Sequence, residues 1–244
     1  MNEALVQRYR AARRDRSLAV LEGFHALKHA LRFGAAVEEA VALEPAELER
    51  LAADLAPDLA GSLASRTAPV DAETLERLVP QAPRTGVVAI ARRPSVDLEA
   101  ALADLRPAPF VLLEDPRTMG NMGACVRVAA AADAAGVMTT GDNDPWRPEA
   151  LRGAAGLHFA LPVARVGQLP ACDRPLVAID PDGEELDPGA LSPRSILAFG
   201  TERYGLSEEL LGRADARLAI PMRDGVSSLN LATAVAAVLF SQRV

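Results

Sequence analysis

The sequence predicts a two-domain α/β protein. Segments with strand-like and helix-like hydrophobic patterns alternate along most of its 244 residues, as they do when helices cover a sheet. From residue 110 onward the strands are nearly continuous apolar runs, which is typical of parallel strands buried on both faces. Three prolines fall between residues 92 and 109 and indicate a connector. We expect a small α/β domain over residues 1–92, a linker over residues 93–109 and a parallel-sheet domain over residues 110–244.

The N-terminal domain begins with an arginine-rich helix, expected over residues 5–14. The remaining pattern predicts strands at residues 18–22, 37–43 and 86–91, and helices at residues 25–33 and after Pro45. The segment near residues 70–79 belongs to the same domain, without an assigned element. In the second domain the apolar runs predict strands at residues 110–114, 136–141, 176–180, 196–200 and 217–221. Helices are expected at residues 123–135 and 228–240.

Charge and composition restrict the function. A formal net charge of −7 and a pI near 5.1 argue against a protein that coats nucleic acid by bulk charge. Cys125 and Cys172 are isolated, which favours neither a disulfide framework nor a zinc site. His25 and His29 are spaced like a metal pair but lack a third ligand, so we expect no metal. Without an apolar run of roughly 18 residues or a signal-peptide core, we expect a cytoplasmic protein.

Small and polar residues mark three strand-to-helix turns of the second domain, where open α/β sheets bind ligands. In the first turn, Asn121 can cap or brace the chain. Arg127 is expected one helical turn in, where it holds a phosphate or forms a surface ion pair. In the second turn, Glu202 is either a reactive carboxylate or a charge that favours a helix N-terminus. In the third, the polar residues either serve the chemistry or include a helix cap, with Ser227 or Ser228 as the capping residue.

The nucleotide-binding patterns GxGxxG and GxxxxGK[ST] are absent from these turns. Instead, NMGACVR, FGTERYGLS and IPMRDGVSSLN follow one another in order. They resemble the three motifs of SpoU/TrmH-type RNA 2′-O-ribose methyltransferases of the SPOUT superfamily: NxGxxxR, GxExxGL and IPMxxxxxSLN. The defining residues stand at Asn121, Gly123, Arg127, Gly200, Glu202, Gly205, Leu206, Ile220, Pro221, Met222, Ser228, Leu229 and Asn230.

This resemblance implies a trefoil-knotted α/β domain that binds S-adenosyl-L-methionine in the knot and forms a homodimer through it. The implied catalytic residues are Arg127, Asn121, Glu202, Ser228 and Asn230. The implied cofactor-binding residues are Thr139, Thr140, Gly141, Gly200, Ile220, Met222 and Leu229. The expected reaction is transfer of a methyl group to a ribose 2′-hydroxyl in RNA.

The hydroxyl must lose its proton, and there are two possible roles for Arg127 in this step. Arg127 acts as the base in a site that makes its guanidinium unusually acidic, or it holds the adjacent phosphate while another group accepts the proton. The second is favoured, because a guanidinium ordinarily stays protonated.

The N-terminal domain is expected to bind the RNA. Residues 1–33 carry seven basic and three acidic side chains, which indicates a phosphate-binding face or a solvated helix. LEGFHALKHAL also resembles the start of the substrate-binding domain of many SpoU-type enzymes. The expected RNA-binding residues are Arg8, Arg10, Arg13, Arg14 and Lys28. Trp146 is expected to pack inside the protein, with base stacking as the alternative.

Ribosomal RNA is the expected substrate, through a role in rRNA modification. A tRNA ribose methyltransferase and a non-catalytic RNA-binding or ribosome-assembly factor on the same fold are the alternatives. The sequence leaves open the nucleotide, the use of naked RNA or a ribosomal particle, and any link to antibiotic resistance.

Overall fold

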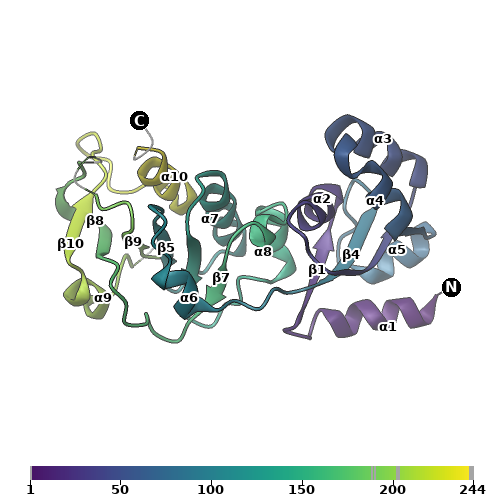
Figure 1. Ribbon diagram of the computed structural model, residues 1–244, viewed down its shortest axis with the longest axis horizontal. Coiled ribbons are helices and arrows are strands. Elements are labelled where there is room, and N and C mark those ends of the chain that lie inside the picture. Colours follow the sequence, from purple (N-terminus) through teal and green to yellow (C-terminus); the bar gives the residue numbers. More distant parts are fainter. Residues whose placement is uncertain (1, 188, 190, 202–203, 242–244) are drawn as a thin grey trace. The chain divides into compact units, whose positions relative to one another are not determined.

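The computed structural model describes residues 2–187, 189, 191–201 and 204–241 (Figure 1). Contacts divide the chain into two compact units. Unit 1 comprises Met1–Ser95 and Trp146–Ala160, and unit 2 comprises Val96–Pro145 and Leu161–Val244. Within the described ranges, no helix has the length and apolar character that crossing a bilayer requires.

Unit 1 contains a sheet with the strand order β1-β4-β2-β3. Its strands are β1 (Leu18–Glu22), β2 (Val37–Ala42), β3 (Thr67–Pro69) and β4 (Val87–Arg92). β4 pairs antiparallel with β1 and β2, whereas β3 is parallel to β2. The helices are α1 (Glu3–Ala12), α2 (Phe24–Arg32), α3 (Pro45–Leu55), α4 (Ala60–Arg66) and α5 (Ala72–Leu78), with a 3₁₀ turn at Pro57–Leu59. The expected elements are confirmed, with ends shifted by one or two residues.

Residues 146–160 pack as part of unit 1, although they were expected to belong with residues 110–244. The segment holds α8 (Pro148–Gly153) and a 3₁₀ turn at Leu157–Phe159. The buried Glu22 carboxylate accepts hydrogen bonds from Arg13 and from Arg152, whose Nη1 lies 2.7 Å away. Gly156 lies so close to α2 that a Cβ atom would stand 2.5 Å from the Ala26 carbonyl oxygen. This ion pair and this close approach fasten the segment to unit 1.

Trp146 lies at the start of this segment and is buried. Its ring packs against His158 and Phe159, with ring centroids 5.1 and 5.2 Å apart. The packing expected for this residue is confirmed, and stacking on a nucleobase does not fit its burial.

His29 makes the stability of unit 1 depend on pH. Its Nδ1 lies 2.7 Å from the Ala155 carbonyl oxygen. Burial lowers the pKa of His29 below its ordinary value of 6.5, and the charges of Lys28, His25 and Arg32 add to this against the opposing effect of the Ala155 hydrogen bond. The unfolded chain therefore takes up the proton first as the pH falls, so the neutral form stabilises the fold above about pH 6.5 and this stability is lost below it.

We expect His29→Asn, which keeps a nitrogen donor for the carbonyl, to flatten the fall in melting temperature between pH 7.5 and 5.5. Thermal unfolding of both proteins across this range checks the expectation. The substitution leaves the other histidines in place, so an unchanged slope would exclude His29 as a source of the pH dependence.

Unit 2 contains a sheet with the strand order β10-β8-β9-β5-β6-β7, in which each neighbouring pair is parallel. Its strands are β5 (Phe110–Leu113), β6 (Gly136–Thr139), β7 (Val163–Arg165), β8 (Leu176–Glu185), β9 (Ile196–Phe199) and β10 (Ala216–Ala219). The helices are α6 (Leu98–Ala103), α7 (Met119–Ala131), α9 (Glu208–Arg213) and α10 (Leu231–Ser241). The parallel sheet was predicted, whereas the short strand β7 was not.

The core of unit 2 explains why its strands are apolar runs. Every residue of β5, β6 and β9 is buried. Phe110 and Leu112 of β5 share one core cluster with Ile196 and Ala198 of β9, because alternate residues of a strand face the same side. The carboxyl ends of the parallel strands meet at one edge of the sheet, and the three motif turns leave from this edge.

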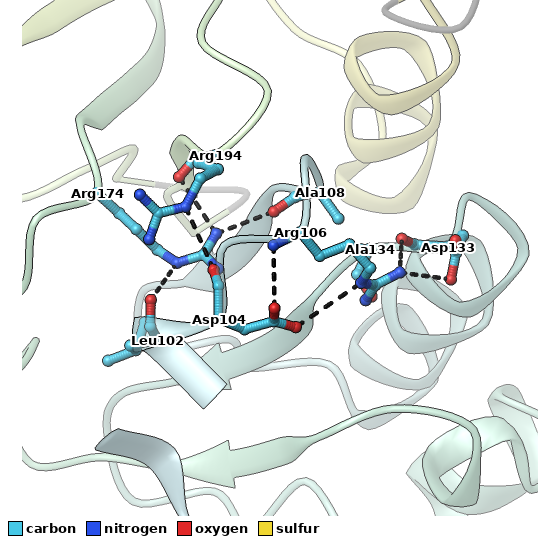
Figure 2. A network of polar contacts seen from close by, with 8 residues as sticks. All are labelled: Leu102, Asp104, Arg106, Ala108, Asp133, Ala134, Arg174 and Arg194. Carbon is cyan, nitrogen blue, oxygen red and sulfur yellow. Dashed lines mark hydrogen bonds and ion pairs between the residues drawn. The ribbon is translucent and has the colours of Figure 1, made fainter. Parts of the chain in front are cut away.

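Residues 96–109, expected within the linker, belong to unit 2. Arg174 holds them in place (Figure 2). This guanidinium is 4% exposed and donates hydrogen bonds to carbonyl oxygens around it. The acceptors belong to Leu102 at 2.7 Å, Asp104 at 2.8 Å, Ala108 at 2.9 Å and Arg194 at 3.3 Å. The buried arginine thus satisfies backbone groups of a segment that has little regular structure.

Candidate active site

The helix of the first motif, α7, begins at Met119 instead of residue 123. Asn121 therefore lies inside the first turn, and the N-cap position belongs to Thr118, whose side chain makes no capping bond. Met122 and Gly123 face the core, so their burial outweighs the low helix propensity of the nearby glycines.

Arg127 stands two turns into α7, where one turn was expected. Its side chain is exposed. No carboxylate among the described residues forms an ion pair with it. The guanidinium therefore remains available to an anionic ligand.

Asn230 joins the third motif to the first. Its Oδ1 accepts hydrogen bonds from the backbone N–H groups of Ala232 at 3.0 Å and Thr233 at 3.4 Å. Its Nδ2 donates to Asn121 Oδ1 at 3.2 Å. α10 begins at Leu231, whereas residue 228 was expected, so the alternative of a serine cap is excluded. Asn230 caps α10 and at the same time links it to α7.

Asn230→Ala removes both the cap and the link. We expect it to lower the free energy of unfolding by about 1–2 kcal/mol, the range for loss of an asparagine cap and of one exposed hydrogen bond. Asn121→Ala removes the link but leaves the cap in place, and it is expected to cost less than about 1 kcal/mol. Urea denaturation of the two variants compares the losses. Equal losses would contradict the assignment of the cap to Asn230.

The loop of the second motif folds back on itself after β9. Thr201 and Gly205 exchange two backbone hydrogen bonds of 3.1 Å. A Cβ atom on Gly200 would stand 2.0 Å from the Gly205 carbonyl carbon, so the loop itself requires glycine there. Glu114, at the end of β5, accepts hydrogen bonds from the Ser207 N–H at 2.7 Å and from its hydroxyl at 2.6 Å. Glu202, which was expected to be catalytic, lies outside the described residues.

A cavity of about 240 Å³ opens beside this loop. We call it the first cavity. Most of the expected cofactor-binding residues line it, together with one expected catalytic residue: Gly200, Ile220, Met222, Leu229 and Ser228. Its other lining residues include Ile179, Asp180, Pro181 and Phe199, which the sequence analysis did not single out. The aspartate that ends the apolar run LVAID was the available signal, since it follows a parallel strand at its carboxyl end.

The expected cofactor residues after β6 lie elsewhere. Thr140 and Gly141 line a second cavity of about 510 Å³. Thr139 is fully buried in β6, so its side chain is closed to a ligand. Thr201 and Gly205 line both cavities. The loop of the second motif therefore forms a wall common to the two.

The side chains that line the first cavity suit an adenosine-type ligand. Ile179, Phe199, Ile220 and Leu229 offer apolar surface for a flat base, and Asp180 offers a buried acceptor. The described part of the chain has no group of three or more His, Cys, Asp or Glu side chains that could hold a metal ion.

The expected RNA-binding residues lie in unit 1. Arg10 and Arg14 are exposed, and Lys28 is half-buried. Arg8 forms an ion pair with Glu38, and Arg13 forms one with the buried Glu22. Arg13 therefore supports the fold of unit 1, while Arg10 and Arg14 are better placed for an external phosphate.

Comparisons with known proteins agree with this geometry. The family model described as "SpoU rRNA Methylase family" matches residues 108–240. A 23S rRNA (uridine(2479)-2′-O)-methyltransferase of Streptomyces viridochromogenes is 31% identical over 63% of this chain and 58% of its own length. An uncharacterised tRNA/rRNA methyltransferase of Mycobacterium bovis is 32% identical over 80% of this chain and 71% of its own. Several curated relatives are matched over only about half of their length.

A solved structure extends the likeness to the whole chain. The AdoMet-bound rRNA methyltransferase of Sinorhizobium meliloti superposes with a TM-score of 0.77, is 26% identical, and is covered over 95% of its chain by 100% of this one. The three motifs, the parallel sheet and the family match together identify the protein: this chain belongs to the SpoU rRNA methylase family.

Proposed function

We propose that this protein transfers a methyl group from S-adenosyl-L-methionine to a ribose 2′-hydroxyl in RNA, and that ribosomal RNA is the substrate. The observation that carries the proposal is the meeting of the motifs in unit 2. Asn230 and Asn121 are hydrogen-bonded across α10 and α7, and Ser228 lines the cavity that Gly200 and Leu229 also line.

The first cavity would hold the cofactor, with its apolar side chains against the adenine. When bound, S-adenosyl-L-methionine supplies an electrophilic methyl group on a sulfonium sulfur. The exposed guanidinium of Arg127 would hold the phosphate beside the target ribose, as a two-pronged donor to its oxygens. This contact fixes the hydroxyl and favours the negative charge that grows on its oxygen as the proton leaves. Asn121 and Asn230 would keep α7 in register with the cavity.

Unit 1 would bind the RNA through the exposed side chains of Arg10 and Arg14. A protein with a net charge of −7 would hold a structured RNA through such a local basic face. The relative from Streptomyces viridochromogenes is named as a 23S rRNA 2′-O-methyltransferase, and this supports rRNA over tRNA. The proposal includes a cytoplasmic site of action, where rRNA is available as substrate.

A homodimer formed through unit 2, which the family resemblance implies to be knotted, is part of the proposal. α7 and α10 pack on one another, and Figure 1 shows them side by side. Their outward side chains include the small, exposed Ala131 and Ala237 and the 43% exposed Phe240. A second copy would cover this apolar face.

We expect Ala237→Arg to turn the dimer into a monomer, because it places a charge in the apolar contact. Light scattering coupled to size exclusion measures the mass. Ser192→Arg, away from α7 and α10, is the control. An unchanged dimer in Ala237→Arg would move the interface to another surface.

The activity is tested with labelled S-adenosyl-L-methionine and, separately, protein-free ribosomal RNA, tRNA and ribosomal subunits. Label recovered as a 2′-O-methylated, alkali-resistant dinucleotide from ribosomal RNA or subunits is expected. Label in tRNA alone would make the protein a tRNA methyltransferase. Binding of RNA without cofactor binding or transfer would support a non-catalytic assembly factor.

A further inference from the structure

Asp180 is a buried carboxylate at the first cavity. It follows Ile179 in β8 and lines the cavity together with Gly200 and Leu229. The residue is 8% exposed, and no other carboxylate in the described part of unit 2 is classed with the buried residues. Burial of a charged group is costly unless its lone pairs are satisfied. The placement of Asp180 therefore calls for a partner on each of its oxygens.

The two oxygens of Asp180 differ in their partners. Oδ1 accepts hydrogen bonds from Arg217 Nη2 at 2.6 Å and Nε at 3.0 Å, and from the Asp182 N–H at 2.9 Å. Oδ2 accepts none from the residues that the structure describes. It lies 3.9 Å from the position that a Cβ atom of Gly205 would occupy, and Gly205 also lines the first cavity. The acceptor without a donor is thus on the cavity side of the carboxylate.

Arg217 pairs with Asp180 and also with Asp182, whose side chain is 85% exposed to solvent. The buried carboxylate of Asp180 thus already has a cationic partner, so its remaining oxygen suits a neutral hydroxyl donor better than a second cation. An unbalanced carboxylate beside the sulfonium would also stabilise the ground state more than the transition state, because methyl transfer removes the positive charge. Asp180 follows the last β8 residue that pairs with β9, and a carboxylate at this edge of a nucleotide-binding sheet can accept hydrogen bonds from ribose hydroxyls.

We infer that Asp180 Oδ2 accepts a hydrogen bond from a ribose hydroxyl of S-adenosyl-L-methionine. This inference rests on the proposed function, because it takes that cofactor to occupy the first cavity. Asp180 is then a residue that binds the cofactor and selects a ribose over a deoxyribose. Arg217 is a positioning residue that fixes the carboxylate and offsets its charge.

The test measures binding by calorimetry, without RNA or turnover, for Asp180→Ala and the wild type. The ligands are S-adenosyl-L-methionine, S-adenosylhomocysteine, 5′-methylthioadenosine, and the 2′-deoxy and 3′-deoxy forms of S-adenosylhomocysteine. Asp180→Ala is expected to bind the three ribose ligands roughly 10- to 100-fold more weakly, the range for a hydrogen bond to a charged group. The wild type is expected to bind one of the deoxy ligands more weakly than S-adenosylhomocysteine by a similar factor. Asp180→Ala is expected to bind that deoxy ligand and S-adenosylhomocysteine with the same affinity.

Asp182→Asn is the matched control. Its side chain contacts Arg217 at 3.1 Å but does not line the first cavity, so unchanged affinities are expected. If Asp180→Ala does not fold, the deoxy ligands test the inference on the wild type.

A loss confined to S-adenosyl-L-methionine would assign the carboxylate to the sulfonium and overturn the inference. A loss that spares 5′-methylthioadenosine would assign it to the amino acid portion, with the same consequence. Equal affinity of the wild type for all ribose and deoxyribose ligands would also refute it while leaving the proposed function intact. If the wild type binds none of these ligands, the proposed function itself fails.

Discussion

Arg127→Ala is expected to lower the rate constant of methyl transfer by at least about 10²–10³, the cost of removing a donor that stabilises developing negative charge. The side chain is exposed on α7, and no described carboxylate competes for it. Its loss should leave the fold and the first cavity unchanged, since Arg127 does not line that cavity. Single-turnover transfer of labelled methyl to RNA gives the rate, and calorimetry gives the affinity for S-adenosyl-L-methionine.

Two further variants separate charge from shape. Arg127→Lys keeps the charge but loses the two-pronged geometry, so it should retain a small part of the activity. Arg165→Ala removes another exposed arginine of unit 2, on the edge strand β7, and should retain nearly all of it. Unimpaired transfer by Arg127→Ala would take the guanidinium out of the mechanism. Weaker cofactor binding in this variant would instead give Arg127 a structural part in the site.

The sequence predicted the sheet of unit 2 well, because strands that are buried on both faces consist of consecutive apolar residues. Every position of β5 and of β9 is buried, and both appear as apolar runs. Helix starts are harder to locate, because caps and packing compete. Asn121 was expected at a turn, yet the buried face of α7 extends the helix through it. Asn230 looked like a polar residue inside a helix and is in fact its cap.

The location of the cofactor loops could not be fully predicted from the sequence. The apolar parts of β6 and β8 are each followed by polar residues, and the sequence analysis chose those after β6. In the sheet, β8 lies between β10 and β9, while β6 is separated from β9 by β5. Asp180 within β8, Gly200 after β9 and Ile220 after β10 are therefore neighbours at the first cavity. Strand order is a property of long-range pairing, which residue periodicity does not encode.

The N-terminal basic residues illustrate a second limit. Arg8, Arg13 and Arg14 are equivalent in a count of charges. Folding gives the first two carboxylate partners from distant positions, Glu38 and Glu22. A local surplus of charge thus marks a region, and the three-dimensional pairing decides which of its members remain available to RNA.

Arg174→Met is expected to destabilise unit 2 by about 3–5 kcal/mol. The arginine is 4% exposed, and it donates to three backbone carbonyls of residues 102–108 and to the Arg194 carbonyl before β9. The guanidinium also lies over the Phe110 ring, 5.0 Å from its centroid. Methionine fills part of the volume but donates nothing, so buried carbonyls lose their partners at about 1–3 kcal/mol each before relaxation. For a chain of this size the melting temperature should fall by roughly 10 °C, at about 2–4 °C per kcal/mol.

Arg194→Met provides the matched comparison, with the same substitution in the same network. Arg194 donates to the Asp104 carbonyl at 3.2 Å and pairs with the exposed Asp173, and such an exposed pair contributes at most about 1 kcal/mol. Differential scanning calorimetry of both variants therefore separates two effects of Arg174→Met: the loss of its hydrogen bonds to buried carbonyls and the loss of a positive charge. Similar losses for the two would mean that Arg174 acts through charge alone. A large loss only for Arg174→Met would show that its buried donors hold residues 102–108 against the sheet, and with them the start of β5, from whose end the first motif departs.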